Sequence, residues 1–321
     1  LLEGGPESVG THPRLAHTLL MQGKLDEGMR EYEWRLRGPG FTWGQRRLPA
    51  WEGDDPAGRV IRVIAEQGFG DAILFARFVP TLAARGARVQ FLVRPALVRL
   101  FAASFDAGRV RITDDRDDLA GLDAHVHLAS VPLRRELAEQ AVARVGPYLR
   151  APDDARARWH DCIAALPGPR IGVVWAGNPE RVGDDSRSIP PALLAPLAVA
   201  VPGASWVSLQ ANATADAPRP FALAADPMAE VNDFADTAAI IESLDLVVSV
   251  DTSVAHAAAA LGKPVMVLAP HNVCWRWDMG GEASPWYDGV QVFRAPGLRE
   301  WQPGVRDAAA ALAAAFPRAA A

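Results

Sequence analysis

The sequence predicts an α/β protein of two doubly wound domains that face a cleft, preceded by a helical hairpin. β-branched runs alternate with Ala- and Leu-rich helical segments, which is typical of parallel strands covered by helices on both faces. This pattern occurs twice, before and after a linker at 146–159. The chain has 321 residues, which is more than one domain of ordinary size usually contains.

Composition and charge restrict the class of protein. Hydrophobic residues make up 50% of the chain and charged residues 22%, as in soluble globular proteins. The net charge of −5 does not favour a nucleic-acid partner. Only Cys162 and Cys274 are present, so we expect no disulfide framework, no zinc site and a cytoplasmic location. No segment has the length and apolarity of a membrane span.

Residues 1–38 are expected to form the helical hairpin. Two helices break at Gly23, and one apolar face is formed by Leu25, Met29, Tyr32 and Leu36. The segment "QGKLDEGMREYEW" resembles the end of a tetratricopeptide repeat, and such repeats need about three units for stability. The chain also opens without Met. We therefore expect the last unit of a longer array and a chain that is part of a longer protein. An ordinary hairpin packed on the next domain is the alternative.

The α/β part divides into residues 39–150 and 151–321. Strands are expected in the first domain at "VIRVIAE", "RVQFLVR", "RVRIT" and "AHVHLAS". In the second they are expected at "RIGVVWAG", "SWVSLQ", "EVNDF", "LDLVVSV", "KPVMVLAP" and "VQVFRA", followed by a closing helix at "VRDAAAALAAAFP". Two such Rossmann-like halves place the carboxyl ends of their strands at the cleft, where these folds bind ligands.

The strongest local motif spans residues 244–270. An apolar strand ends at Val250, Asp251-Thr252-Ser253 form a turn, and a helix of small residues follows. The free amides at that helix start could bind phosphate oxygens through the helix dipole. Thr252 or Ser253 could instead simply cap the helix. His256 lies one turn further on, close enough to face the same cleft.

A second motif, residues 170–190, joins a strand to Trp175-Ala176-Gly177-Asn178 and then to a polar loop that ends in Arg187-Ser188. A guanidinium pairs with phosphate in bidentate fashion and stays charged, so Arg187 suits an anionic leaving group. The alternative is an exposed loop arginine without a particular role.

The stretch "EQGFGDAILF", residues 66–75, contains a Gly-Phe-Gly-Asp turn before a helix expected at 71–86. It is not the GxGxxG dinucleotide fingerprint, so a nicotinamide enzyme is not favoured. Asp71 could cap the helix, which is worth about 1 kcal/mol. It could equally present its carboxylate to a substrate, and the local sequence leaves both interpretations open.

Three further patterns are less specific. His125 and His127 share one face of a strand without a third metal ligand nearby, which favours packing. The charged run around 115–117 has the Asp-x-Asp spacing of metal-dependent sugar-nucleotide enzymes, but a solvated turn is the more common meaning of such a run. The tryptophans at 275–286, together with Arg276, either line a sugar or acceptor surface or fill the core.

Three segments taken together resemble glycosyltransferase family nine, the heptosyltransferase-like enzymes. They are "EQGFGDAILFARFVP", "IGVVWAGNPE…DDSRSIP" and "DFADTAAIIESLDLVVSVDTSVAHAAAALGKPVMVLAP", and the likeness extends over about residues 25–301. It is greatest to the branch in which tetratricopeptides precede the catalytic part, similar to flagellin glycosyltransferases. The resemblance implies a GT-B fold and an enzyme that transfers a sugar from a nucleotide-sugar donor with inversion, without metal or cofactor.

The resemblance also implies roles for individual residues. Asp71 matches the general base, and Arg187 lies near the place of a cation for the donor phosphate. The matching donor element comprises Asp251, Thr252, Ser253 and His256. From the same turns we assign Trp175, Gly177, Asn178, Ser188 and Gln210 to the donor, and Gln67, Gly68, Phe69 and Gly70 to the acceptor side of the cleft.

The donor loop departs from the family pattern. Lipopolysaccharide heptosyltransferases usually carry a lysine there, whereas this loop offers arginines, so the donor need not be ADP-heptose. The tetratricopeptide-like hairpin points to a protein acceptor. By analogy we expect Ser or Thr of a protein such as flagellin, with a nonulosonic acid from a CMP-sugar. The alternatives are a heptosyltransferase acting on a lipopolysaccharide-type glycan, a GT-B epimerase, a scaffold, and a catalytically inactive nucleotide-sugar or protein-binding module.

Overall fold

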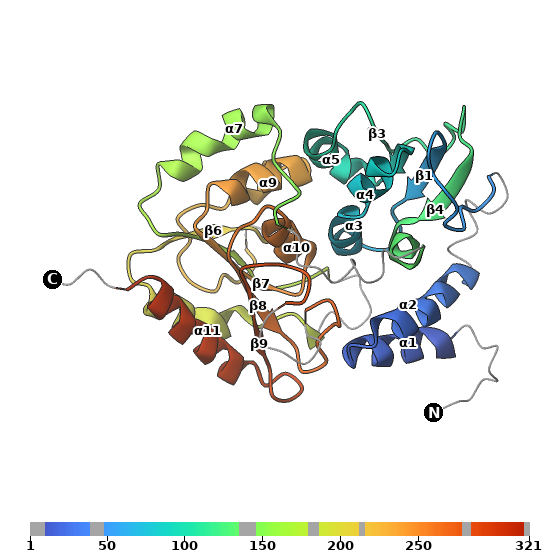
Figure 1. Cartoon of the computed structure of the whole chain (residues 1–321). Helices are drawn as coiled ribbons and strands as arrows, with labels where there is room; N and C mark the ends of the chain where they lie inside the picture. Colours follow the sequence, from blue (N-terminus) through green and yellow to red (C-terminus); the bar gives the residue numbers. More distant parts are fainter. Residues whose placement is uncertain are drawn as a thin grey trace.

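The computed structural model describes residues 10–38, 48–134, 146–178, 186–211, 216–277 and 284–317. These residues form a helical hairpin and two parallel sheets with helices packed around them (Figure 1). The alternation of strands and helices seen in the sequence therefore produces the predicted α/β fold. The domain boundaries at 38 and 150 stay predictions.

The first sheet has four parallel strands in the order β3-β2-β1-β4. They are β1 (Val60–Ile64), β2 (Arg88–Leu92), β3 (Val110–Thr113) and β4 (Ala124–His127). We call these strands and the helices between them the first lobe. The helical segments are α3 (Phe69–Ala76), α4 (Val79–Ala84), η3 (Pro95–Leu97), α5 (Val98–Ser104) and η4 (Leu128–Leu133).

The helix expected at 71–86 begins earlier and is interrupted. Gly68 is its N-cap, and α3 ends at Ala76 before α4 starts at Val79. Pro80 is the second residue of α4 and has no backbone N–H to continue the hydrogen bonding of α3. The sequence pattern of one long helix is therefore divided between two short ones.

The second sheet has five parallel strands in the order β6-β5-β7-β8-β9. They are β5 (Arg170–Val174), β6 (Ser205–Ser208), β7 (Leu246–Val250), β8 (Val265–Ala269) and β9 (Val290–Arg294). With their helices they form the second lobe. These helices are α7 (Asp153–Ala164), η6 (Pro191–Leu194), α8 (Ala195–Ala200), η7 (Pro227–Ala229), α9 (Phe234–Glu242), α10 (Ser253–Ala260) and α11 (Trp301–Ala315).

The strand expected at "EVNDF", residues 230–234, is wrong. The carboxylate of Asp233 accepts hydrogen bonds from the backbone N–H groups of Ala235 and Asp236, so this segment leads into α9. An N-cap of this kind fixes the start of a helix and overrides the weak strand preference of one valine. The closing helix predicted near the C-terminus is confirmed as α11.

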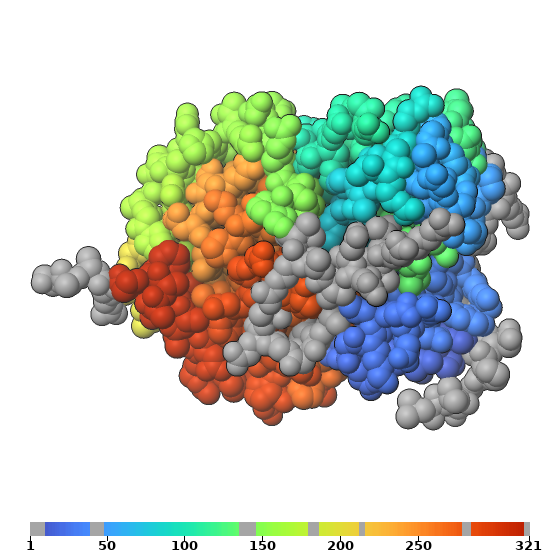
Figure 2. All heavy atoms as spheres, viewed as in Figure 1, coloured from blue at the N-terminus to red at the C-terminus, as the bar shows by residue number. Residues whose placement is uncertain are grey.

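The hairpin consists of α1 (Thr11–Met21), α2 (Leu25–Tyr32) and the 3₁₀ turn η1 (Glu33–Arg37). Its two helices cross closely at Gly28, where a Cβ atom would lie 2.7 Å from Leu20 Cγ. Figure 2 shows the hairpin, in blue, packed against the rest of the chain. A buried ion pair of 2.7 Å between Arg35 and Glu66 joins it to the first lobe. This agrees with a hairpin packed on the next domain, and the tetratricopeptide assignment stays a prediction.

Two polar patterns noted in the sequence serve the packing of the first lobe. Residues 114–117 form an exposed turn, and the buried Arg62 of β1 donates a hydrogen bond to its backbone at the Arg116 carbonyl, 2.8 Å away. His125 and His127 are buried in β4. No helix within the described ranges is long and apolar enough to cross a bilayer.

Burial of His127 makes stability depend on pH. Burial, and secondarily the charges of Arg35 and His125, lower the pKa of His127 from 6.5 to about 3. Below pH 6.5 His127 therefore binds a proton in the unfolded chain but not in the folded chain. The free energy of unfolding falls as the pH decreases from 6.5 towards 3. Between pH 7.5 and 5 this group should remove about 2 kcal/mol from the free energy of unfolding.

Urea unfolding of His127→Gln across this pH range checks the expectation. The variant should show a pH dependence that is flatter than that of the wild type by about 2 kcal/mol. His160→Gln, on the exposed side of α7, is the matched control. Parallel curves for the wild type and His127→Gln would contradict the assignment.

Candidate active site

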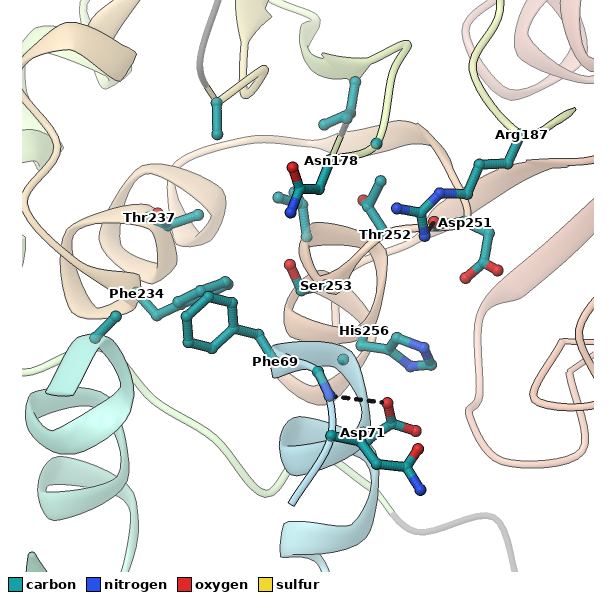
Figure 3. A pocket seen from close by; sticks show the side chains of 18 of the residues that line it. Phe69, Asp71, Asn178, Arg187, Phe234, Thr237, Asp251, Thr252, Ser253 and His256 are labelled. Atoms are coloured by element: carbon teal, nitrogen blue, oxygen red, sulfur yellow. Dashed lines mark hydrogen bonds between the residues drawn. The ribbon is translucent and has the colours of Figure 1, made fainter. Parts of the chain in front are cut away.

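A cavity of about 690 Å³ lies between the two lobes and is closed on one side by the hairpin. This volume is in the range of pockets that hold nucleotide-sized ligands. Its walls include the N-terminal turns of α3 and α10, the residues that follow β5 and β7, and the start of α9 (Figure 3). The predicted site residues that line it are Gln67, Gly68, Phe69, Gly70, Asp71, Gly177, Asn178, Arg187, Gln210, Asp251, Thr252, Ser253 and His256.

Trp175 and Ser188, predicted to contact the donor, do not line this cavity. Trp175 is 5% exposed and belongs to the core of the second lobe. The hydroxyl of Ser188 accepts a hydrogen bond from the backbone N–H of Gly177 at 3.0 Å. Trp175 and Ser188 therefore support the turn after β5 on the side away from the cavity. The small residues of that turn, Ala176 and Gly177, line the cavity.

The N-terminus of α10 opens into the cavity. Thr252 is the N-cap residue, but its hydroxyl lies 3.0 Å from the hydroxyl of Ser249 and makes no capping bond to the helix. The capping interpretation of Thr252 is therefore wrong, and the first-turn N–H groups are left for other acceptors. The Arg187 guanidinium donates a hydrogen bond to the Asp251 carbonyl at 3.1 Å, which places a cation beside this helix start (Figure 3).

Aromatic residues fix the other polar groups of this turn. The indole N–H of Trp277 donates to the Asp251 carboxylate at 2.6 Å. The His256 ring stacks on Trp277 with centroids 4.2 Å apart, and its Nδ1 lies 3.0 Å from the hydroxyl of Tyr287. Burial, followed by the charges of Arg276 and Arg77, lowers the pKa of His256 well below its usual value. His256 is thus a neutral imidazole that packs between the lobes.

Asp71 satisfies both interpretations that the sequence left open. It is the third residue of α3, and its Oδ2 accepts a hydrogen bond from the Gly68 N–H at 3.3 Å, as a capping carboxylate does. It also lines the cavity, with 20% of its side chain exposed. Its Oδ1 is ion-paired with the guanidinium of Arg276, whose side chain is 14% exposed. A carboxylate is therefore held at the cavity wall opposite Arg187 (Figure 3).

Several cavity residues were not assigned to the site from the sequence. Tyr32 comes from the hairpin, Arg276 follows β8, and Phe234 begins α9. The Phe234 ring lies 5.1 Å from that of Phe69, so the two lobes each supply one ring to the apolar end of the cavity (Figure 3). Of the aromatic cluster at 275–286, Trp277 and Trp286 fill the core, and Trp275 is buried against the cavity wall.

The sequence profile of glycosyltransferase family 9 (heptosyltransferase) matches residues 228–272. This segment contains α9, β7, α10 and β8, and so the helix start that opens into the cavity. This segment of the chain is therefore similar to glycosyltransferase family 9. Over 347 residues it is 28% identical to Protein FlbA of Caulobacter vibrioides, covering 96% of this chain and 56% of FlbA. The chain thus spans little more than half the length of that relative.

Two solved structures are similar to the chain, and the first of them shares its fold. The family 9 glycosyl transferase of Veillonella parvula superposes with a TM-score of 0.56 at 11% identity, over 83% of this chain and all of the other. ADP-heptose lipopolysaccharide heptosyltransferase II of E. coli gives 0.48 at 14% identity, over 79% and 98% of the two chains. The first superposition confirms the predicted GT-B fold.

Gly70 allows α3 of the first lobe to pack closely against α10 of the second lobe. A Cβ atom at this position would lie 2.9 Å from His256 Cδ2, and the His256 ring cannot swing away because Trp277 and Tyr287 hold it. Gly70→Ala should therefore force α3 and α10 apart and lower the free energy of unfolding by about 1–3 kcal/mol. Urea denaturation measures this. Gly146→Ala, where the added Cβ meets nothing within 4 Å, is the control, and equal stability of the two variants would contradict the prediction.

Proposed function

We propose that the protein is an inverting, metal-independent glycosyltransferase that moves a sugar from a nucleotide-sugar donor to a Ser or Thr hydroxyl of a protein. One observation carries the proposal: the open N-terminus of α10 with Arg187, and the carboxylate of Asp71, face one cavity from different lobes. The relation to glycosyltransferase family 9 supports the same reaction class.

In the proposed reaction the acceptor oxygen attacks the anomeric carbon from the face opposite the nucleotide. The carbon–oxygen bond to the phosphate breaks, its electron pair leaves with the nucleotide, and the acceptor proton passes to Asp71. Fixed N–H dipoles of α10 and the Arg187 cation stabilise the charge that grows on the phosphate, so no metal is required. A positioned base of this kind contributes about 10²–10⁴ in rate.

The donor and the acceptor are narrower proposals. The arginines that line the cavity are Arg94, Arg187 and Arg276. Arginine in place of the lysine of lipopolysaccharide heptosyltransferases supports a donor other than ADP-heptose. We propose a nonulosonic acid carried by CMP. The hairpin forms part of the cavity wall, which supports a protein acceptor such as flagellin, modified in the cytoplasm. The family description, heptosyltransferase, favours ADP-heptose and a lipopolysaccharide-type acceptor as the second candidate.

A nucleotide screen tests donor binding. CMP, UDP, GDP and ADP at millimolar concentration are compared by thermal shift, and one of them should raise the Tm, because a ligand at a hundred times its Kd stabilises by about 2.7 kcal/mol. CMP supports the first donor and ADP the second. Arg187→Ala should reduce the shift, whereas Arg30→Ala, exposed on α2, should retain it. A wild type that responds to none of the four refutes the proposal.

Replacement of Asp71 tests the chemistry. Asp71→Asn keeps an oxygen that can accept from the Gly68 N–H but removes the proton acceptor. We expect kcat to fall about 10²–10⁴-fold while the Kd of the nucleotide stays unchanged. Asp161→Asn, on the exposed face of α7, should behave as the wild type, and EDTA should not inhibit. Full activity of Asp71→Asn would exclude Asp71 as the base.

A further inference from the structure

The hairpin supplies residues to the same cavity as the two lobes. Pro13, His17 and Tyr32 line it together with Asp71 and Arg276. We propose that Tyr32 is a positioning residue for Asp71 and that the hairpin thereby completes the active site. The hydroxyl of Tyr32 binds Gln67 and Arg276, the residues that set the turn before Asp71 and the orientation of its carboxylate. This inference rests on the function proposed above.

The first link runs from Tyr32 to the backbone of the turn. Gln67 has a φ of +66°, a left-handed conformation that is unfavourable for a residue with a side chain. Its side-chain oxygen accepts a hydrogen bond from the Tyr32 hydroxyl at 2.7 Å, and its carbonyl accepts one from Arg94 at 2.7 Å. Strained conformations persist where the surroundings hold them, and they occur often at functional sites. Tyr32 and Arg94 both bind Gln67 and so help to keep it in its left-handed conformation.

The second link runs from Tyr32 to the carboxylate. Nη2 of Arg276 donates to the Tyr32 oxygen at 3.2 Å and is also ion-paired with Oδ1 of Asp71. A hydroxyl donates one proton and accepts through its lone pairs, so Tyr32 can donate to Gln67 Oε1 or accept from Gln67 Nε2, 2.5 Å away, while it accepts from Arg276. Such a chain of hydrogen bonds strengthens each member. Nη1 of Arg276 donates to Cys274 Sγ at 3.0 Å, and the guanidinium lies over the Trp275 ring. The oxygen of Tyr32 is the contact of Arg276 that comes from the hairpin, and it binds the same nitrogen that is paired with Asp71.

The position of Tyr32 itself does not depend on its hydroxyl. Its ring packs edge-on against Trp275, with centroids 6.4 Å apart. The buried ion pair between Arg35 and Glu66 also anchors the hairpin, and Glu66 directly precedes Gln67 in the sequence. Burial also raises the pKa of Tyr32, which keeps the phenol protonated as a donor. Replacement by Phe thus removes the hydrogen bonds to Gln67 and Arg276 and leaves the packing.

The experiment compares Tyr32→Phe with Tyr148→Phe in the full chain. The Phe variant of Tyr148 loses the hydroxyl bonds to the Ile73 carbonyl, 2.9 Å away, and to the Tyr287 hydroxyl, 3.5 Å away, and Tyr148 does not line the cavity. CMP-N-acetylneuraminic acid, UDP-glucose, GDP-mannose and ADP-glucose are supplied with water as acceptor, and release of the nucleotide is measured. We expect Tyr32→Phe to lower kcat about tenfold with unchanged KM and nucleotide Kd, and Tyr148→Phe to keep the wild-type kcat.

A second measurement does not depend on turnover. Hydrogen exchange of the backbone amides at 66–71 should become at least severalfold faster in Tyr32→Phe and remain as in the wild type in Tyr148→Phe. Unchanged exchange in Tyr32→Phe overturns the inference, as does a kcat equal to that of Tyr148→Phe. These outcomes leave donor binding intact. The proposed function fails separately, when the wild type binds no nucleotide.

Discussion

The arrangement of the site depends on the contact between α3 and α10, made where Gly70 leaves room for His256. This contact places two helix N-termini side by side, and each carries a partial positive charge. In α3 the carboxylate of Asp71 lies in the first turn and compensates that charge. The first turn of α10 contains no acidic residue. Of the two adjoining helix starts, that of α10 is therefore the one available to an anion from outside.

The sequence was sufficient for the parts of this site that follow from local pattern. Strand-turn-helix segments placed Asn178 and Thr252 at the carboxyl ends of parallel strands, and parallel strands bring those ends to one edge of a sheet. Contacts between distant segments could not be predicted in this way. Tyr32 and Arg276 meet across 244 positions, and no periodicity reports such a contact. Trp175 was assigned to the donor from its place in the turn after β5, and the sequence does not tell which residues of such a turn face the core and which the cavity.

Two ion pairs flank the turn at Gln67, and the first of them is buried. Glu66 precedes Gln67 and pairs with Arg35, and Asp71 follows it and pairs with Arg276. Burial raises the pKa of Glu66 even though Arg35 opposes that shift. Buried ion pairs of this kind contribute little net stability, because desolvation offsets their attraction, but breaking one leaves an uncompensated charge. Their main effect is therefore on specificity: another position of the hairpin or of the turn would leave one of these charges without its partner.

The division of the site among three parts of the chain separates binding from chemistry. The groups proposed to hold the donor, including Asn178, Arg187 and Thr252, all belong to the second lobe. The carboxylate of Asp71, by contrast, is contacted by Arg276 of the second lobe, which the hairpin orients through Tyr32. In the proposed reaction the donor is therefore held by the second lobe alone, whereas the proposed base is in place only when both lobes and the hairpin are together.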